Sequence, residues 1–252
     1  RAGQFELHYQ AKREIRSGRI TGTEALLRWQ HPDLGTVAPM QFIPAAEETG
    51  LIVPIGKWVL LTACRQNVAW QRAGGAPPLC MAVNLTPRQF ADENLLSDLA
   101  ATLAATGMDA QLLELEISEG MLMRDVPKTM RILTALKKMG VNVAIDDFGI
   151  GYSSLSNLRQ FPLDTIKLDR MLVTGIECEE DVAMIARAAI SLGKSLRKTV
   201  VAEGVENQAQ FDFLRYQGCD EFQGYLLSRP VPEAQLTRLL HAGGGMIAPE
   251  PG

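Results

Sequence analysis

The sequence predicts an α/β fold, a (β/α)₈ barrel of the TIM type that is modified by one antiparallel strand. Short apolar runs alternate with amphipathic helical stretches along the whole chain, and this repetition favours parallel strands with right-handed crossovers. The length of 252 residues is the size expected for one such barrel. Because no linker rich in Pro and Gly interrupts the middle of the chain, we expect a single domain.

Eight short apolar runs are predicted to be the barrel strands. In chain order they lie at residues 6–10, 23–29, 80–84, 113–117, 141–146, 165–168, 199–203 and 221–225. The first run alternates apolar and polar residues, as a half-buried strand does. A short segment with the turn-like pair Ser17-Gly18 joins the first two runs, so we expect one of these two strands to be antiparallel to the rest.

Four amphipathic helices are predicted between the strands, at residues 53–73, 126–139, 181–196 and 207–217. Gly74, Gly140 and Gly218 follow three of them and are typical C-terminal stops. We expect the barrel to occupy residues 1–242, and the segment 243–252, which is rich in Gly and Pro, to be a flexible tail. The chain opens with Arg1 and soon enters a strand, so we expect it to be part of a longer protein.

The composition argues against several kinds of binding partner and site. The formal net charge is -4 and no basic stripe occurs, so we expect no nucleic-acid polymer as a partner. The four cysteines form no CxxC pair and the three histidines no HExxH motif, which argues against a zinc site or a disulfide framework. No apolar run approaches the ~20 residues of a membrane span. We therefore expect this domain to be cytoplasmic, although a longer protein could be anchored in a membrane elsewhere.

Nearly every predicted strand carries a polar residue or is directly followed by one, most of them at the C-terminal end: Glu24, Asn84, Glu116, Glu119, Asp146, Asp147, Lys167, Asp169, Glu203, Glu206 and Gln223. In a TIM-type barrel these ends meet at the rim that carries the active site. So many acids together are costly unless cations neutralise them, and oxygen ligands without His or Cys select Mg²⁺ or Mn²⁺. The adjacent Asp146 and Asp147 suit a pair of metals, which can activate water against a phosphodiester.

Each of these residues has a plainer interpretation when it is taken alone. Glu24 could be a surface acid, and the pair 146–147 could cap a loop. Glu116 and Glu119 could form a solvated face. Lys167 could be a surface lysine, or the Schiff-base lysine of an aldolase-like barrel. The convergence of all these positions on one rim favours the metal site.

The segments that carry these residues resemble the EAL domain family of bacterial cyclic-di-GMP phosphodiesterases. In chain order the motifs are TEALLRWQHP at 23–32, VNL at 83–85, LEISE at 115–119, DDFGIGYSSL at 146–155, IKLDR at 166–170, AEGVE at 202–206 and QGY at 223–225. The resemblance spans roughly residues 5–240. Its specificity lies in the number and order of the motifs, since a lone EAL tripeptide would carry no weight.

The resemblance implies metal-binding and catalytic roles. The first metal ion would be held by Glu24, Asn84, Glu116 and Asp146, and the second by Asp146, Asp147 and Glu203. The implied catalytic residues are Lys167, Glu203 and Gln223. Lys167 would orient or help to deprotonate the attacking water, and Gln223 would steady that water.

The resemblance also implies residues that bind the substrate or support the site. Gln10, Leu26 and Arg28 would contact the substrate, and the guanidinium of Arg28 would suit two oxygens of a phosphate. Glu119 would hold the loop 148–154 through backbone N–H groups or through the serines of that loop, and Glu206 would be a supporting acid near the metals.

The function implied by the resemblance is hydrolysis of cyclic-di-GMP to the linear dinucleotide 5′-pGpG, with two Mg²⁺ or Mn²⁺ ions per site. Ca²⁺ is expected to bind but to inhibit, because it prefers more ligands and longer bonds. A homodimer is expected, with the loop 148–154 and a helix at 155–159 near its interface. Fusion to upstream sensory or GGDEF-type domains is expected as well.

Three positions depart from the family pattern. The family usually has a small residue, Thr or Ala, where this chain has Ile150, and commonly has Pro where it has Ala11. Ser118 replaces the usual Thr, which is a conservative change. We expect Ile150 to affect turnover or dimer coupling, and Ile150→Thr to be tolerated.

Three other functions compete with hydrolysis. The first is a catalytically weak or inactive EAL domain that serves as a cyclic-di-GMP receptor, but every ligand position is filled here, which favours catalysis. The second is a Schiff-base aldolase that uses Lys167, which would leave the acids unexplained. The third is a scaffold that works only through its dimer surface.

Overall fold

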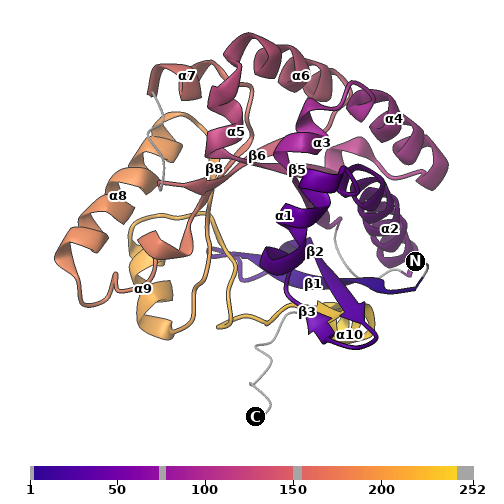
Figure 1. The fold of residues 1–252 in the computed structure, drawn as a ribbon. Coiled ribbons are helices and arrows are strands. Elements are labelled where there is room, and N and C mark those ends of the chain that lie inside the picture. Colours follow the sequence, from indigo (N-terminus) through magenta and orange to yellow (C-terminus); the bar gives the residue numbers. More distant parts are fainter. Residues whose placement is uncertain (1–2, 74–77, 150–154, 243–252) are drawn as a thin grey trace.

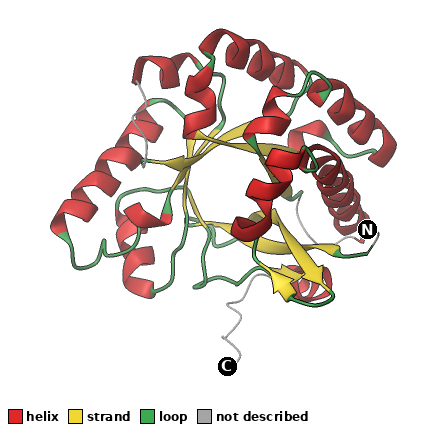
Figure 2. Ribbon diagram, viewed as in Figure 1, coloured by secondary structure: helices red, strands yellow, loops and turns green. Residues whose placement is uncertain are grey.

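A closed ring of strands surrounded by helices forms the body of the protein (Figures 1 and 2). The computed structural model describes residues 3–73, 78–149 and 155–242. Within these ranges no helix combines the length and the apolar character that crossing a membrane requires. The expected C-terminal tail lies outside the described residues.

The ring contains eight strands: β1 (Phe5–Glu14), β2 (Ile20–His31), β4 (Cys80–Leu85), β5 (Leu113–Ser118), β6 (Asn142–Phe148), β7 (Thr165–Leu168), β8 (Thr199–Ala202) and β9 (Glu221–Phe222). From β2 through β9 each strand is parallel to its neighbour in the ring. β1 closes the ring and is antiparallel to both β2 and β9. The prediction of an eight-stranded barrel with one antiparallel strand is confirmed.

Two short strands extend this ring and were not predicted. β3 (Gly35–Val37) pairs with the end of β2, and β10 (Val231–Pro232) pairs with β1. They contain only three and two residues, too few to show an apolar period. The first two barrel strands are also longer than predicted, because β1 and β2 run as one hairpin of 10 and 12 residues beyond the apolar runs.

The four predicted helices are confirmed, each with ends within one residue: α2 (Ile52–Ala73), α6 (Val126–Lys138), α8 (Glu180–Ser195) and α9 (Gln208–Tyr216). The helix expected at residues 155–159 is present as α7 (Leu155–Gln160). The remaining helices are α1 (Pro39–Thr49), α3 (Pro87–Ala91), α4 (Leu95–Thr106), α5 (Glu119–Arg124) and α10 (Glu233–His241), with 3₁₀ turns η1 (Ala110–Leu112) and η2 (Arg170–Leu172). Most of these additional helices lie around the outer side of the ring or on its rim (Figure 1).

Alternation along each strand separates the outer apolar core from the lumen of the ring. In β5, Leu113, Leu115 and Ile117 are fully buried against the surrounding helices, whereas Glu114 and Glu116 belong to the opposite face of the strand. Because a closed barrel turns one face of every strand inward, these two glutamates lie inside the ring. The lumen is therefore lined in part by acids.

Candidate active site

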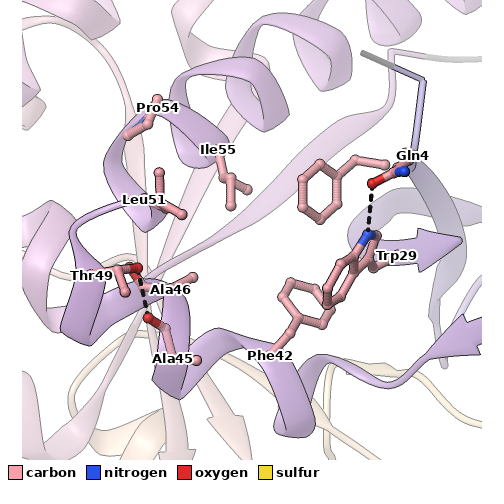
Figure 3. A pocket seen from close by; sticks show the side chains of 10 residues that line it. Gln4, Trp29, Phe42, Ala45, Ala46, Thr49, Leu51, Pro54 and Ile55 are labelled. Carbon is pink, nitrogen blue, oxygen red and sulfur yellow. Dashed lines mark hydrogen bonds between the residues drawn. The ribbon is translucent and has the colours of Figure 1, made fainter. Parts of the chain in front are cut away.

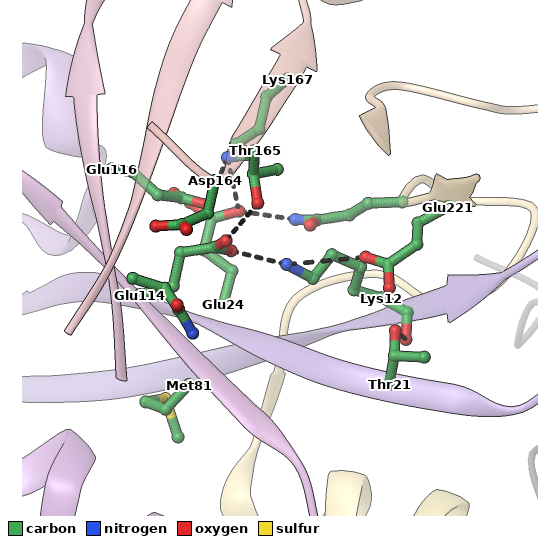
Figure 4. A network of polar contacts seen from close by, with 12 residues as sticks. Lys12, Thr21, Glu24, Met81, Glu114, Glu116, Asp164, Thr165, Lys167 and Glu221 are labelled. Carbon is green, nitrogen blue, oxygen red and sulfur yellow. Dashed lines mark hydrogen bonds and ion pairs between the residues drawn. The ribbon is translucent and has the colours of Figure 1, made fainter. Parts of the chain in front are cut away.

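The polar residues at the strand ends meet around one buried ammonium group. Lys167 Nζ, near the end of β7, lies 2.7 Å from Glu116 Oε1 and 2.6 Å from Glu203 Oε1. Asp146 Oδ1 is 3.2 Å from this nitrogen and Glu24 Oε2 is 3.8 Å from it. Lys167 is only 1% exposed, so four carboxylates and not solvent surround its charge. Figure 4 shows Lys167, Glu24 and Glu116 inside the ring of strands.

A chain of amide hydrogen bonds fixes one of these carboxylates. Asn84 Nδ2 donates to Glu24 Oε1 over 2.6 Å, and Gln223 Nε2 donates to Glu24 Oε2 over 2.6 Å. Gln223 Nε2 also donates to Gln10 Oε1 over 2.9 Å, and Gln10 Nε2 donates to the Ser228 carbonyl over 2.9 Å. Both oxygens of Glu24 are thus held by side chains from other strands of the ring.

The electrostatics of the cluster are dominated by burial and by repulsion among the acids. Burial and then the Glu24 carboxylate raise the pKa of Glu116 well above its usual value. Burial also raises the pKa of Glu203, to about 8, although Lys167 opposes this shift. For Lys167, burial alone would lower the pKa, but Glu116, Glu203 and the other carboxylates hold it well above the ordinary value. The lysine is therefore an ammonium ion at neutral pH.

Several carboxylate oxygens in the cluster are enclosed without a hydrogen bond. Both oxygens of Glu116 and Oδ1 of Asp146 accept none from the described residues, although the ammonium of Lys167 lies close by. One oxygen each from Asp146, Asp147 and Glu203 lie within 4.8 Å of one another. Closely spaced, unsatisfied carboxylate oxygens are the ligands that hard divalent cations take. The donor set therefore fits a divalent metal ion.

The turn after β6 determines the orientation of Asp147. Asp147 has a φ of 55°, in the left-handed region, and Gly149 has a φ of 103°. A Cβ at Gly149 would lie 2.4 Å from Leu172 Cδ1, and this positive φ favours glycine over residues with a side chain. Glu119 Oε2, at the start of α5, accepts a hydrogen bond from Gly149 N over 3.3 Å. Burial and the neighbouring Asp146 raise the pKa of Asp147 to about 6.

A pocket of about 290 Å³ opens beside the carboxylates. Its lining includes Gln10, Leu26, Asp146, Asp147, Glu203, Glu206 and Gln223 from the residues predicted to act at the site. Asn84 instead lines a neighbouring pocket of about 330 Å³. Arg28 belongs to neither lining within the described part of the chain, and its Nη1 donates to the Leu27 carbonyl over 2.9 Å. The structure thus gathers the predicted residues except Arg28, which lies to one side.

Two charged residues of the lining were not assigned a role from the sequence. Asp169 was noted at a strand end, and it lines the pocket, contributes to the raised pKa of Asp147, and accepts from Met171 N over 2.6 Å. Arg170 follows it and also lines the pocket. Both are the last residues of the IKLDR motif, and their position directly after a predicted strand was the available signal.

A separate apolar pocket of about 400 Å³ lies beyond the end of β2, between α1 and the start of α2 (Figure 3). Phe5, Trp29 and Phe42 form one side, and Leu51, Pro54 and Ile55 contribute to the lining as well. No ionisable side chain lines this pocket among the described residues. The acid chemistry therefore belongs to the smaller pocket.

Comparison with known proteins decides the family. The family model described as the EAL domain matches residues 1–230. The chain belongs to the EAL domain family. The bifunctional diguanylate cyclase/cyclic di-GMP phosphodiesterase MucR of Pseudomonas aeruginosa is 45% identical over 233 residues, which cover 92% of this chain and 34% of MucR. The cyclic di-GMP phosphodiesterase NbdA of the same organism is 41% identical over 242 residues, which cover 96% of this chain and 31% of NbdA.

Solved structures agree with this assignment. The PaMucR phosphodiesterase in complex with c-di-GMP superposes on this EAL domain with a TM-score of 0.89 at 45% identity, covering 92% of this chain and 94% of that one. The chain spans only 29–34% of the length of the first curated relatives it matches. It therefore corresponds to one domain of those longer proteins.

The geometry of this EAL domain removes the plainer interpretations of single residues. Glu24, Glu116 and Glu119 are 7%, 1% and 5% exposed, so none is a surface acid. A Schiff-base lysine must reach a neutral amine, whereas Lys167 is held as an ammonium by its four acidic neighbours. The aldolase interpretation is therefore not supported.

The three departures from the family pattern have different structural consequences. The backbone N–H of Ala11 donates to Ser228 Oγ over 3.4 Å, a bond that a proline could not form. Ser118 occupies the N-cap position of α5 without a side-chain cap bond. Ile150, together with the two serines expected to bind Glu119, lies outside the described residues.

Proposed function

We propose that this EAL domain hydrolyses one phosphodiester bond of cyclic di-GMP and releases the linear dinucleotide 5′-pGpG, using two Mg²⁺ or Mn²⁺ ions. The observation that carries the proposal is the convergence of Glu116, Asp146 and Glu203 on one buried site with unsatisfied carboxylate oxygens. The names of MucR and NbdA and the complex of PaMucR with c-di-GMP support the choice of substrate.

The two cations would take ligands from overlapping sets. The first would be held by Glu24, Asn84, Glu116 and Asp146, and the second by Asp146, Asp147 and Glu203. Contacts of three members of the first set with Lys167 Nζ, and the close oxygens of the second set, support this division. When bound, such a pair lowers the pKa of water and stabilises the entering and leaving oxygens of a phosphodiester.

The protein's own groups would orient the water and the substrate. Lys167, as an ammonium, is a hydrogen-bond donor, so it would orient a water or a phosphate oxygen and not accept a proton. Gln223 is held by Glu24 and Gln10 and presents its carboxamide to the pocket. Without a metal ion the pKa of Glu203 is about 8, so this carboxyl group would release its proton when it binds the second cation.

Substrate contacts would come from the pocket rim. Gln10 and Leu26 line the pocket and would contact the dinucleotide. Arg28 is half-buried and is not among the lining residues, although the lining residues Glu24 and Tyr225 act on its charge, and it would contact a phosphate on binding. Glu206 lines the exposed side of the pocket and would support the site there.

The domain is further proposed to act as a cytoplasmic homodimer within a longer signalling protein. The greater length of the relatives, and the diguanylate cyclase activity in the name of MucR, support additional domains. The four cysteines are unpaired thiols, which suits a reducing compartment. Light scattering would test the dimer, and a purely monomeric domain with full activity would contradict a required dimer.

The test is hydrolysis of cyclic di-GMP in Mg²⁺ or Mn²⁺, followed by chromatography of the products. We expect 5′-pGpG from the wild type and none from Asp146→Asn. Asp33→Asn is the matched control, because Asp33 is exposed and far from the pocket lining. Substitution of Ca²⁺ should preserve binding of the dinucleotide and abolish its hydrolysis. Binding without any hydrolysis in Mg²⁺ and Mn²⁺ would replace the proposal with the receptor function.

A further inference from the structure

A second buried charged cluster lies in the lumen of the barrel, on the N-terminal side of the first. Lys12 of β1 donates from Nζ to Glu114 Oε1 of β5 over 2.7 Å, and Glu221 Oε2 of β9 lies 3.7 Å from the same nitrogen. Thr165 of β7 donates its hydroxyl to Glu114 Oε2 over 2.6 Å. We refer to Lys12, Glu114, Thr165 and Glu221 as the lower cluster. The upper cluster comprises Lys167, Glu24, Glu116, Asp146 and Glu203.

The lower cluster has no direct access to a ligand. The side chains of Lys12 and Glu114 are each 5% exposed, and neither residue lines the pocket beside the carboxylates. The hydrolysis proposed above uses none of the four residues. Replacing a buried ion pair by apolar residues is often neutral or stabilising, so stability alone does not account for this pair.

The two clusters share two strands. Glu114 and Glu116 are two residues apart on the same face of β5, and Thr165 and Lys167 are two residues apart on the same face of β7. β6 separates β5 from β7 in the ring, so the bond between Glu114 and Thr165 spans an intervening strand. At this level β6 contributes Ala144, which pairs with both Glu116 and Thr165. The hydrogen bond between Thr165 and Glu114 therefore helps to fix the position of Lys167 along the barrel axis relative to Glu116.

The lower cluster also contains a competitor for Lys167. Glu114 is a buried carboxyl group two residues before Glu116 on the same face of β5, and it forms an ion pair with Lys12. Figure 4 shows Glu114 and Glu116 on the same side of the lumen, with Lys12 and Lys167 approaching from different strands. Lys12 and Thr165 each donate to a different oxygen of Glu114, so the charge of this carboxylate is already paired with that of Lys12.

We infer that Lys12 and Glu114 form a positioning pair: Lys12 neutralises Glu114 and thereby keeps the ammonium of Lys167 in the upper cluster, where hydrolysis of the cyclic dinucleotide needs it. This inference rests on the proposed function for its catalytic consequence. Without Lys12, the unpaired Glu114 carboxylate attracts Lys167 toward the N-terminal side of the barrel. Glu116 and Glu203 then lose the ammonium group that lies within 2.7 Å of each.

The inference predicts unequal effects of removing the two partners. Lys12→Met leaves Glu114 as a free competitor, so kcat should fall by about 10–100-fold, the range for loss of a supporting residue. Glu114→Gln removes the competitor and leaves Lys12 near Glu221, so kcat should stay within about threefold of wild type. The double variant should recover to the level of Glu114→Gln. KM should change less than kcat in all three, because neither residue touches the pocket.

A merely structural pair would behave differently. It would make Glu114→Gln as harmful as Lys12→Met, and the double variant would show no recovery; either result overturns the inference. Thermal unfolding of each variant identifies misfolding, and the double variant, in which only Glu221 has lost its lysine, keeps the test available if Lys12→Met does not fold.

A crystal structure of Lys12→Met gives a readout independent of turnover. Lys167 Nζ should lie within hydrogen-bond distance of Glu114 and should have left Glu116. A lysine unmoved from Glu116 would overturn the inference. A wild-type domain that did not hydrolyse cyclic di-GMP would refute the proposed function, and the crystal structure would still decide how Lys167 is positioned.

Discussion

Replacing Lys167 by Met should destabilise the metal-free domain far more than the loss of one lysine ordinarily does. The ammonium lies within 4 Å of four carboxylates from β2, β5, β6 and the end of β8, and it is almost completely buried. Methionine has a similar volume but no charge. The substitution therefore leaves the acids facing one another across the lumen while it preserves the packing.

The magnitude follows from the burial of the group. Removing one partner of a buried ion pair costs about 3–5 kcal/mol. For a chain of this size each kcal/mol lowers Tm by roughly 2–4 °C, so Tm should fall by about 6–20 °C. The loss should be larger near pH 8.5 than near pH 6, because the pKa of Glu203 is about 8 and a protonated carboxyl repels its neighbours less.

The assay is thermal unfolding of both proteins in a chelator and then in excess Mn²⁺. A cation that binds the folded state stabilises it by mass action, and Mn²⁺ should raise the Tm of Lys167→Met more than that of the wild type. Lys57→Met is the matched control: Lys57 pairs with Asp98 at 2.8 Å on the surface, and its loss should hardly move Tm. A Tm for Lys167→Met equal to that of the control would refute the reasoning.

Three further outcomes follow from particular contacts. Glu119→Ala removes the acceptor of the Gly149 N–H and should weaken metal dependence or activity by about 10–100-fold, and an unchanged Mg²⁺ titration would show that Glu119 has another role. Asp164→Ala removes both bonds to Lys137 Nζ, at 2.8 Å each, together with a cap on the start of β6, and urea unfolding should show a loss of about 1–3 kcal/mol. The contribution of Glu203 to the free energy of unfolding should fall as pH rises from about 4.5 to about 8, because the folded state holds the proton of this carboxyl group in that pH range and the unfolded state does not. The measurement is the free energy of unfolding at several pH values, in a chelator, for the wild type and Glu203→Gln. The same dependence on pH in both proteins would contradict the prediction.

The eight barrel strands could be predicted because each carries an apolar run that the closed ring buries. The extra strands β3 and β10 could not, since their pairing depends on where β2 and β1 happen to end. Helices α1, α3 and α5 were missed for a related reason. They are short segments on the rim, and their burial is set by neighbours in space and not by a long amphipathic period.

The acids of the site could be predicted because parallel strands deliver their C-terminal ends to one rim. The lower cluster could not be predicted in this way. Lys12 and Glu114 are 102 residues apart, and they meet only because antiparallel β1 closes the ring and carries the lysine across the lumen. The contact of Gln10 with Ser228, 218 residues away, has the same origin. Sequence patterns report which face of a strand is inward, but closure decides which inward residues touch.

The distribution of charge between the two clusters connects the fold with the proposed chemistry. A TIM-type lumen is ordinarily filled by layers of branched apolar side chains. Here the lower layer places one lysine against two glutamates, and the upper layer places one lysine against four acids. The greater excess of negative charge therefore lies at the end of the lumen that opens into the pocket, where cations can enter and bind. Because the lower lysine is paired with Glu114, the upper lysine remains among the acids that need it.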